Sequence, residues 1–166
     1  MNNDYDTKPA HEAIDRIWEL AAKMRTCMLI TAAQTQLNAR PMSAHVKRED
    51  HAIYFLDKTG SPKEIQIAEN PSVMLAFVDN DANKFISIRG TAEVTNDRAL
   101  IKDLWNSFYK AWWDSEDDPE IRVITFRPES GELWDGLNNL MTSGAMLVSA
   151  VTGNAPKLGE NAKVNL

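Results

Sequence analysis

Ser61, Pro62, Lys63 and Glu64 form the stretch of the sequence best suited to hold a ligand. Ser61 and Glu64 are spaced as a capping box and Pro62 takes the first helical position, so a helix is predicted to begin here. The first N–H groups of a helix are unpaired, the helix dipole is positive at that end, and Lys63 adds a positive charge. These properties suit a phosphate group. The same residues also fit an ordinary capped surface helix with an exposed lysine.

The other side chains able to do chemistry give weaker signals. The single cysteine, Cys27, lies in an apolar run, which favours a buried, inert thiol over a nucleophile. The three histidines, His11, His45 and His51, lack the spacing of metal ligands, and the acidic stretch 114–120 has no accompanying ligand cluster. We therefore predict no metal site. The catalytic residues are unknown, because no general acid or base is evident.

Short strands are predicted to position the turn at Ser61. Apolar runs and two-residue alternation predict strands at 26–32, 39–47, 52–56, 73–78, 84–94 and 123–126, with a turn at 128–131 and a short return strand at 133–134. Gly90 lies in the middle of the clearest alternating stretch and suggests a bulge or a sharp bend. Polar turns at 34–38 and 48–50 separate the earlier strands.

A few helices complete the pattern. Apolar residues recur at helical spacing across 11–23, and the helix that begins at Ser61 is stopped by the pair Asn70-Pro71. Further helices are predicted at 97–113 and 138–152. We favour core packing over cofactor stacking for Trp105 and Phe108. Many strands and few helices indicate a mainly β protein, an antiparallel barrel with peripheral α-helices.

Length and charge narrow the function classes. The chain has 166 residues, enough for one domain with a hydrophobic core. We expect a disordered N-terminus at 1–10, a single domain at 11–152 and a loose tail at 153–166. The net charge is −6 and the basic residues are scattered, which argues against nucleic-acid binding. No segment suits a membrane span or a secretion signal, and one cysteine fits a reducing compartment, so we expect a cytoplasmic protein.

Five segments in register carry a family resemblance. They are Arg40–Ala44, Tyr54–Asp57, Ser61 with Lys63, Ile67–Pro71 and Ile88–Val94. Their order and spacing resemble the FMN-binding split-barrel family of pyridoxamine 5'-phosphate oxidase. The later tryptophans, the acidic segment 117–119 and the stretch 132–135 are more similar to the general stress protein 26 branch of that family. The resemblance covers roughly residues 13–135.

The resemblance implies a homodimeric split barrel with two flavin sites at the subunit interface. The resemblance implies a set of cofactor-binding residues. Arg40, Pro41, Met42 and Ser43 would lie along the ring edge, with Arg40 near the phosphate or the ring carbonyls. Leu56 and Asp57 would lie beside the ribityl chain, and Ser61 and Lys63 at the phosphate. Trp113 and Trp134, with Trp112, would wall the ring from the partner subunit. The sequence departs from the family pattern at Asp57, where a threonine is usual, and at Phe85, where a polar flavin contact is usual. Both changes imply a reduced cofactor affinity.

The resemblance implies an FMN-dependent oxidoreductase of the general stress type, with FAD or another flavin as the alternative cofactor. Vitamin B6 oxidation is disfavoured, because the basic residues and histidine that hold pyridoxal phosphate in the oxidase are missing after Asp135. A non-catalytic flavin-binding protein of the stress response is the alternative. A structural dimer with a lost site, marked by Asp57 and Phe85, is a third possibility.

Overall fold

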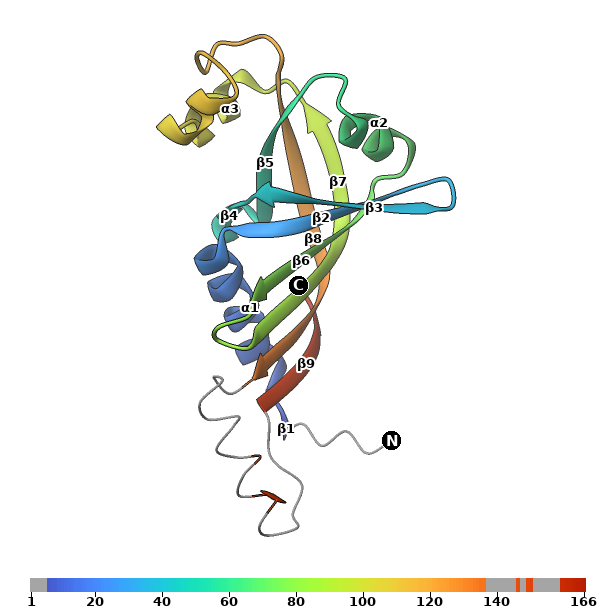
Figure 1. Ribbon diagram of the computed structural model, residues 1–166, viewed down its shortest axis with the longest axis vertical. Helices are drawn as coiled ribbons and strands as arrows, with labels where there is room; N and C mark the ends of the chain where they lie inside the picture. Colours follow the sequence, from blue (N-terminus) through green and yellow to red (C-terminus); the bar gives the residue numbers. More distant parts are fainter. Residues whose placement is uncertain (1–5, 137–145, 147–148, 151–158) are drawn as a thin grey trace.

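The computed structural model describes residues 6–136, 146, 149–150 and 159–166. In these ranges the chain forms one strongly curled sheet with helices at its sides and end (Figure 1). The strands are β1 (Asp6–Thr7), β2 (Thr26–Ala33), β3 (Gln36–Ser43), β4 (His45–Lys47), β5 (Ala52–Lys58), β6 (Ser72–Asp79), β7 (Lys84–Thr95), β8 (Ile121–Gly136) and β9 (Gly159–Asn165). The α-helices are α1 (Ala10–Met24), α2 (Pro62–Glu69) and α3 (Arg98–Leu104), with short 3-10 helices η1 (Arg48–Asp50) and η2 (Ser107–Ala111). A mainly β fold with peripheral helices is therefore confirmed.

The sheet order is β1-β9-β8-β7-β6-β2-β3, and β5 joins β8 on one side and β4 on the other. All pairs are antiparallel except β1 with β9. The long strand β8 changes partner along its length. Its first half lies between β5 and β7, and its second half lies between β7 and β9. This change of partner lets the sheet curl around its core.

Strand β8 runs without interruption where two strands and a turn were predicted at 123–134. The turn signal came from Pro128, which in the fold faces Gly90 at a register shift between β7 and β8. A bulge tolerates a proline because one residue there is left out of the ladder. Gly90 is required at this point, since a Cβ would collide with the Arg127 carbonyl oxygen. The predicted bulge at Gly90 is thus confirmed, and the predicted turn is wrong.

Both predicted loose ends contain strand where the structure describes them. Residues Gly159–Asn165, inside the expected tail 153–166, form β9 along the second half of β8. Asp6 and Thr7, inside the expected disordered segment 1–10, pair with β9. Without β9, the edge of β8 would carry unpaired N–H and C=O groups. Backbone pairing satisfies these groups whatever the side chains are, so the polar segment of β9 can form a strand here. The predicted helix 138–152 lies largely outside the described residues, as do residues 153–158.

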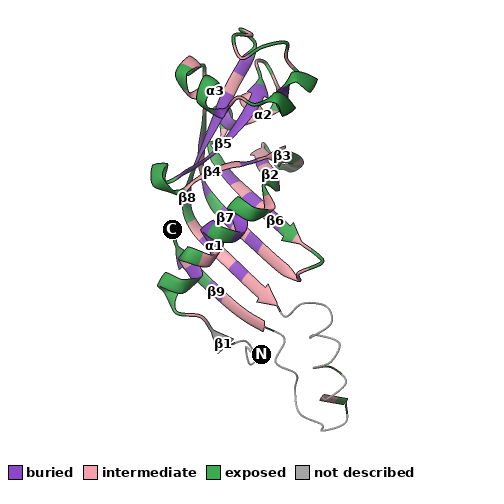
Figure 2. Ribbon diagram, turned by 90° about the vertical axis from the view of Figure 1, so that its left-hand side faces the viewer, coloured by how far each residue is buried: buried purple, intermediate pink, exposed green. Residues whose placement is uncertain are grey.

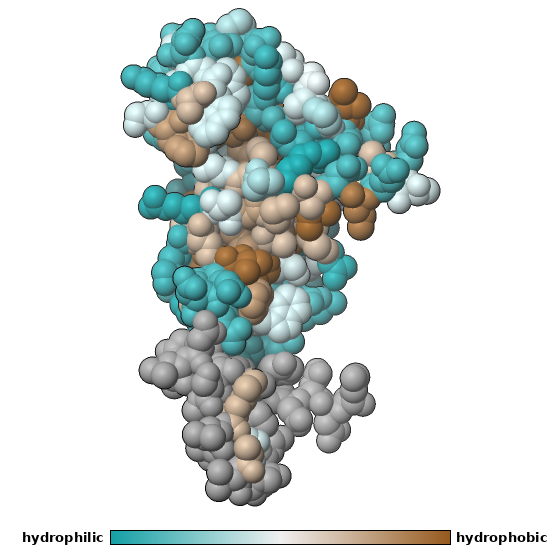
Figure 3. Space-filling model, viewed as in Figure 1, coloured by the Kyte–Doolittle hydropathy of each residue, from teal (hydrophilic) through white to brown (hydrophobic). Residues whose placement is uncertain are grey.

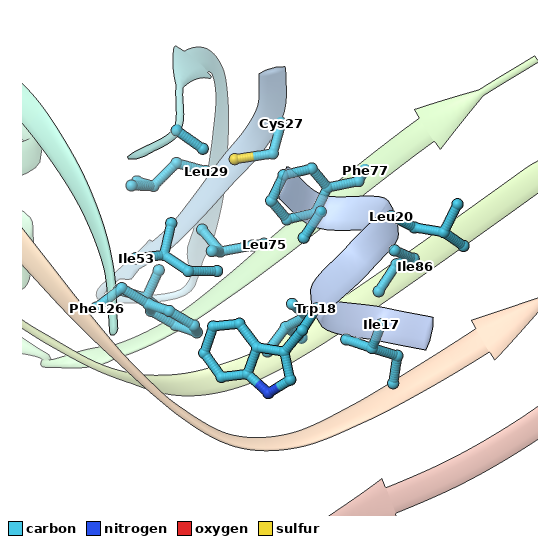
Figure 4. Close-up of a cluster of buried hydrophobic side chains, with 14 of the residues drawn as sticks. Ile17, Trp18, Leu20, Cys27, Leu29, Ile53, Leu75, Phe77, Ile86 and Phe126 are labelled. Atoms are coloured by element: carbon cyan, nitrogen blue, oxygen red, sulfur yellow. The ribbon is translucent and has the colours of Figure 1, made fainter. Parts of the chain in front are cut away.

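Helix α1 covers the inner face of the sheet, as its apolar stripe predicted. Its buried face, which includes Ile17, Trp18 and Leu20, packs on side chains of β2, β6, β7 and β8 (Figure 4). We call this cluster the main core. Its largest fully buried side chains include Phe55, Phe77 and Phe126. Burying apolar area of this kind is the dominant stabilising contribution to the fold.

A second cluster, the small core, lies under α3 and η2 at one end of the molecule (Figure 2). Its buried residues are Ala52, Tyr54, Leu56, Ile101, Leu104, Tyr109, Ile121 and Val123. The helix predicted over 97–113 is broken here, because α3 ends at Leu104 and the backbone of Trp105 and Asn106 is extended. The Asn106 side chain accepts a hydrogen bond from the Phe108 N–H at 3.0 Å and so starts η2. Asparagine competes with the helix in this way.

Part of the outer face of the sheet is apolar. Register places Met28 opposite Pro41, Ile30 opposite Met74, and Val78 opposite Phe85. These six residues define what we call the outer apolar face, which gathers over β2 and β6 in Figure 3. Helices α1 and α2 lie on the opposite side, since both contribute to the main core. Within the described ranges, no helix combines the length and hydropathy needed to cross a membrane.

Candidate functional site

A cavity of about 430 Å³ lies where β3 and β5 end, α2 begins and η2 passes over them. It is within the size range of small-molecule sites, and aromatic or apolar groups form much of its wall. The lining residues are Thr26, Pro41, Met42, Ser43, Leu56, Asp57, Lys58, Lys63, Phe108, Tyr109, Trp112 and Trp113. Eight of the eleven residues implied by the family resemblance line this one cavity. They are Pro41, Met42, Ser43, Leu56, Asp57, Lys63, Trp112 and Trp113.

The end of β5 leads directly into the cavity wall and then into α2. Gly60, at φ +69°, makes the tight turn between them, a conformation that glycine adopts without strain. Half of the predicted capping box forms: the Ser61 hydroxyl accepts the Glu64 N–H at 3.2 Å, whereas the Glu64 carboxylate accepts the N–H of Gly60 rather than that of Ser61. Helix α2 therefore begins where the sequence predicted, with some of its first donors already satisfied by its own side chains.

Lys63 and Asp57 form an ion pair at this end of the cavity. The Lys63 Nζ lies 3.0 Å from Asp57 Oδ1, and the Ser61 hydroxyl donates a hydrogen bond to the other carboxylate oxygen. Only 15% of the Lys63 side chain and 8% of the Asp57 side chain are exposed. The interpretation of Lys63 as an exposed lysine is thus wrong. An anion bound here would share Lys63 with a buried carboxylate, which opposes binding.

Helix η2 supplies an aromatic wall. Phe108 and Trp112 lie with ring centroids 4.9 Å apart, and Tyr109 and Trp113 lie 6.1 Å apart. Phe108 and Trp112 are 57% and 61% exposed, which is unusual for side chains of this size. Core packing, predicted for Phe108, is therefore wrong, whereas Trp105 does pack against the small core. Flat, partly exposed rings of this kind can stack on a planar ligand.

Three residues implied by the resemblance lie outside the cavity wall. Arg40 donates hydrogen bonds to Thr31 Oγ1 at 3.0 Å and to Gln66 Oε1 at 2.9 Å, so it links β3 to β2 and α2. Ser61 lies behind Asp57, as described above. Trp134 lies on β8 opposite Phe85 of β7, at the other end of the sheet from η2. Arg40 and Ser61 therefore do not line the cavity but are hydrogen-bonded to residues around it.

The sequence reasoning missed the pair formed by Tyr109 and His45. The Tyr109 hydroxyl is hydrogen-bonded to His45 Nε2, and Tyr109 is only 4% exposed. Burial raises the pKa of the Tyr109 phenol, while a hydrogen bond with Ser43 opposes that rise. Burial also lowers the pKa of His45, with Lys47 acting in the same direction. The cluster of aromatic residues at 105–113 could have drawn attention to Tyr109, but no sequence pattern predicted that His45 would be its partner.

Neither a metal centre nor a reactive thiol accompanies the cavity. In the part of the chain that the structure describes, no three His, Cys, Asp or Glu side chains gather as a metal site would require. Cys27 is buried in the main core, and burial raises the pKa of its thiol to about 12. The predicted burial of Cys27 is confirmed, and the raised pKa of its thiol agrees with the inert role predicted for it.

The fold and the cavity agree with the family found by comparison. The chain belongs to the family described as pyridoxamine 5'-phosphate oxidase like, whose model matches residues 12–157. General stress protein 26 of Bacillus subtilis (strain 168) is 25% identical over 79 residues, which are 47% of this chain and 56% of that protein. The chain thus matches little more than half the length of this curated relative.

Solved structures share the architecture. A protein described as a general stress protein 26 from Jannaschia sp. CCS1 superposes with a TM-score of 0.78 at 23% identity, covering 95% of this chain and 100% of that one. The general stress FMN/FAD binding protein of Xanthomonas citri gives a TM-score of 0.67 at 24% identity, covering 78% and 91%. The antiparallel split-barrel fold expected from the sequence is confirmed by these likenesses.

Proposed function

We propose that this protein binds a flavin, with FMN as the first choice, and acts as a flavin-dependent oxidoreductase of the general stress type. The observation that carries the proposal is the cavity between the ends of β3 and β5, the start of α2 and the aromatic wall of η2. The X. citri relative, described as an FMN/FAD binding protein, supports the same class of ligand. A bound flavin would supply the hydride chemistry, and the protein would orient it and tune its surroundings.

The cavity suits the parts of a flavin mononucleotide. Trp112, Trp113 and Phe108 offer faces for a flat ring, and Pro41 and Met42 offer an apolar edge. Lys63 at the start of α2 offers a cation for the phosphate. The partner of Lys63, Asp57, weakens that attraction, so we expect an affinity for FMN below that of a site without this carboxylate.

A non-catalytic flavin-binding role is the second candidate. It is favoured by the same Lys63–Asp57 pair, because a weakly held cofactor suits storage or sensing as well as turnover. We do not propose vitamin B6 oxidation, since the cationic residues expected for pyridoxal phosphate are missing from the sequence after Asp135. We place the protein in the cytoplasm, in keeping with its single, buried cysteine.

Titration with FMN and with riboflavin tests the flavin site. If the phosphate lies beside Lys63, Lys63→Ala weakens FMN binding by about 1.5 to 3 kcal/mol. Asp57→Asn is the matched variant: it frees Lys63 from its counter-ion and strengthens FMN binding. Riboflavin lacks the phosphate, so its affinity changes little in either variant. Changes of flavin fluorescence on binding measure all six affinities, those of wild type and of the two variants for each flavin.

Two outcomes would count against this proposal. A wild-type protein that binds neither FMN nor riboflavin has no flavin site. Equal changes for FMN and riboflavin in both variants would mean that Lys63 and Asp57 act only by supporting the turn before α2. Thermal unfolding of each variant separates the second outcome from a general loss of stability, because Lys63→Ala leaves the buried Asp57 carboxylate without its cation.

We also propose that the protein is a homodimer that associates through its outer apolar face. The support is an apolar sheet surface that includes Met28 and Val78, 37% and 57% exposed, and that reaches the cavity at Pro41. A second copy would cover this face and place its own residues near the cavity mouth.

Met74→Glu, within the face, should give a monomeric mass in light scattering. Ile65→Glu changes an apolar residue of α2 that is 54% exposed and should leave the dimer intact. A wild-type monomer would contradict the proposal.

A further inference from the structure

Two cavities adjoin at the ends of β3 and η2. The second has a volume of about 640 Å³ and is lined by Ala22, Arg25, Thr26, Ser43, Ala44, His45, Val46, Lys47, Asn106 and Phe108. Both cavities are bounded by Thr26, Ser43 and Phe108. Tyr109 lines the first cavity and His45 lines the second, so these two side chains form part of the wall that separates them.

A hydrogen bond crosses this wall. It joins the Tyr109 hydroxyl to His45 Nε2, and the two rings stack with centroids 5.6 Å apart and planes at 27°. The backbone on each side is fixed. His45 pairs with Tyr54 in the ladder between β4 and β5, and the Asn106 cap holds the first turn of η2. The contact is therefore a built feature of the fold rather than a meeting of two surface side chains.

The surroundings favour the neutral form of both groups. Tyr109 keeps its proton, because burial raises the pKa of the phenol despite the opposing hydrogen bond with Ser43. His45 stays uncharged near neutral pH, because burial and then Lys47 lower the pKa of the imidazole, with Asp103 opposing. Arg25 lines the same cavity as His45. A protonated phenol next to a neutral imidazole is an arrangement that can give up one proton and pass on another.

The other ionisable groups of the first cavity are already engaged. Asp57 and Lys63 neutralise each other at 3.0 Å, and Lys58 lies 3.0 Å from a carboxylate oxygen of Glu120. Tyr109 is the remaining ionisable group among the residues that line this cavity. Its hydroxyl also has a partner that faces a second, separate cavity. A proton lost on one side of the wall can thus be replaced from the other.

We propose that Tyr109 is the proton donor to a substrate reduced in the first cavity and that His45 returns the proton from water in the second cavity. This inference rests on the proposed oxidoreductase function. The flavin would supply a hydride to one atom of an electron acceptor such as a quinone. The O–H bond of Tyr109 then breaks, its proton joins the other acceptor oxygen, and a phenolate remains. His45 passes its Nε2 proton to the phenolate while its Nδ1 takes a proton from a water molecule, which leaves as hydroxide into the solvent of the second cavity, so charge and protons balance.

The first test needs no flavin. NMR titration of the tyrosine and histidine ring signals in the full-length protein should show coupled ionisation. Tyr109→Phe, which keeps the ring and its aromatic contacts, should shift the titration midpoint of His45, and His45→Gln should shift that of Tyr109. Tyr54→Phe is the control, since this buried tyrosine is hydrogen-bonded to Asp50 and not to His45. Unchanged midpoints in both variants would overturn the relay.

The second test follows the reaction. The FMN-loaded protein is reduced anaerobically and mixed with menadione, and flavin reoxidation is followed by stopped flow. Loss of general acid catalysis in Tyr109→Phe should slow this step on the order of a hundredfold. His45→Gln should slow it less and change its pH profile, while Tyr54→Phe reoxidises like wild type. FMN affinity should be unchanged in His45→Gln and Tyr54→Phe, and each variant is saturated with FMN so that the rates compare fully loaded proteins.

The outcomes separate the two proposals. If wild type binds no FMN, or if its bound flavin does not reduce menadione, the proposed oxidoreductase function is overturned, and the proton donor loses its reaction with it. If wild type turns over and Tyr109→Phe reoxidises at the same rate, the oxidoreductase function stands and the role of Tyr109 is overturned. Thermal unfolding of each variant confirms that the comparison is between folded proteins.

Discussion

The main core and the small core share a strand but differ in what surrounds them. Along β5, Ile53 and Phe55 face the main core, while Tyr54 and Leu56 face the small core. The main core is enclosed by the curled sheet and by α1. The small core is covered by two short helical segments, α3 and η2, and borders the cavity. The candidate site thus lies beside the less well covered cluster, where we expect local opening to cost less free energy than global unfolding.

The largest expected effect is on the main core. Phe77 is fully buried, and Phe77→Ala should lower the free energy of unfolding by about 3 to 5 kcal/mol, because it removes apolar contacts and leaves a cavity. Urea unfolding followed by circular dichroism measures this loss. Ile65→Ala on α2 is the control, since Ile65 is exposed and its loss should cost within about 0.5 kcal/mol. Similar losses in both variants would contradict the division into buried and exposed regions.

A smaller and more local effect is expected in the small core. Leu104 is buried at the end of α3, and Leu104→Ala should cost about 2 to 3 kcal/mol, at the lower end for a buried leucine because the thin cover can collapse into the space. Hydrogen exchange should speed up in α3 and η2 more than in α1. Ligand binding at the cavity should weaken with it. Equal acceleration in all three helices would mean that the two clusters unfold as one unit.

The smallest effect concerns a charge cluster that ties α1 to the sheet. Asp135 is hydrogen-bonded to Lys84, and its Oδ2 lies 2.9 Å from Arg16 Nε. Burial alone would raise the pKa of Asp135, but the hydrogen bonds with Lys84 and Arg16 outweigh it and hold the pKa below its ordinary value. Asp135→Asn should cost about 1 to 2 kcal/mol at neutral pH.

The pH dependence of this cluster has a definite sign. The folded pKa of Asp135 lies below the unfolded one, so the unfolded chain binds more protons in the acidic range between them. The stabilisation is complete above the unfolded pKa and is lost as the pH falls through the folded pKa. Asp135→Asn should therefore flatten the acid side of the stability profile. Glu132→Gln is the control, because both of its partners, Arg89 and Lys163, are more than half exposed. An acid limb unchanged in Asp135→Asn would contradict this assignment.

Local signals made much of the fold predictable. Ser61, Pro62 and Glu64 lie within four residues of one another, and the helix start with its Ser61 N-cap formed as expected. The two-residue alternation in β7 and the apolar stripe of α1 also predicted which residues of each element are buried. The break after Leu104 was missed because the apolar spacing continues through it, although the Asn106 cap overrides that spacing. Pro128 misled for the opposite reason, since its effect depends on Gly90 in another strand.

The family segments predicted which residues gather at the candidate site but not their electrostatics. Six residues of these segments line one cavity. The pairing of Lys63 with Asp57 across the turn could not be read from the helix-start signal, which treats the lysine as free. The contact between His45 and Tyr109 joins residues 64 positions apart. A contact of that kind depends on how β4 and η2 are brought together, which no local pattern records.

Because β5 contributes to both cores, a ligand bound in the cavity should raise the free energy of unfolding of the whole molecule. A ligand that holds the small core in place also holds the strand on which Ile53 and Phe55 support the main core. At a free concentration of roughly a hundred times its Kd, such a ligand adds about 2.7 kcal/mol to the free energy of unfolding. Screening quinones, flavins and other planar compounds by their effect on melting temperature would therefore find natural ligands without any prior assay of turnover.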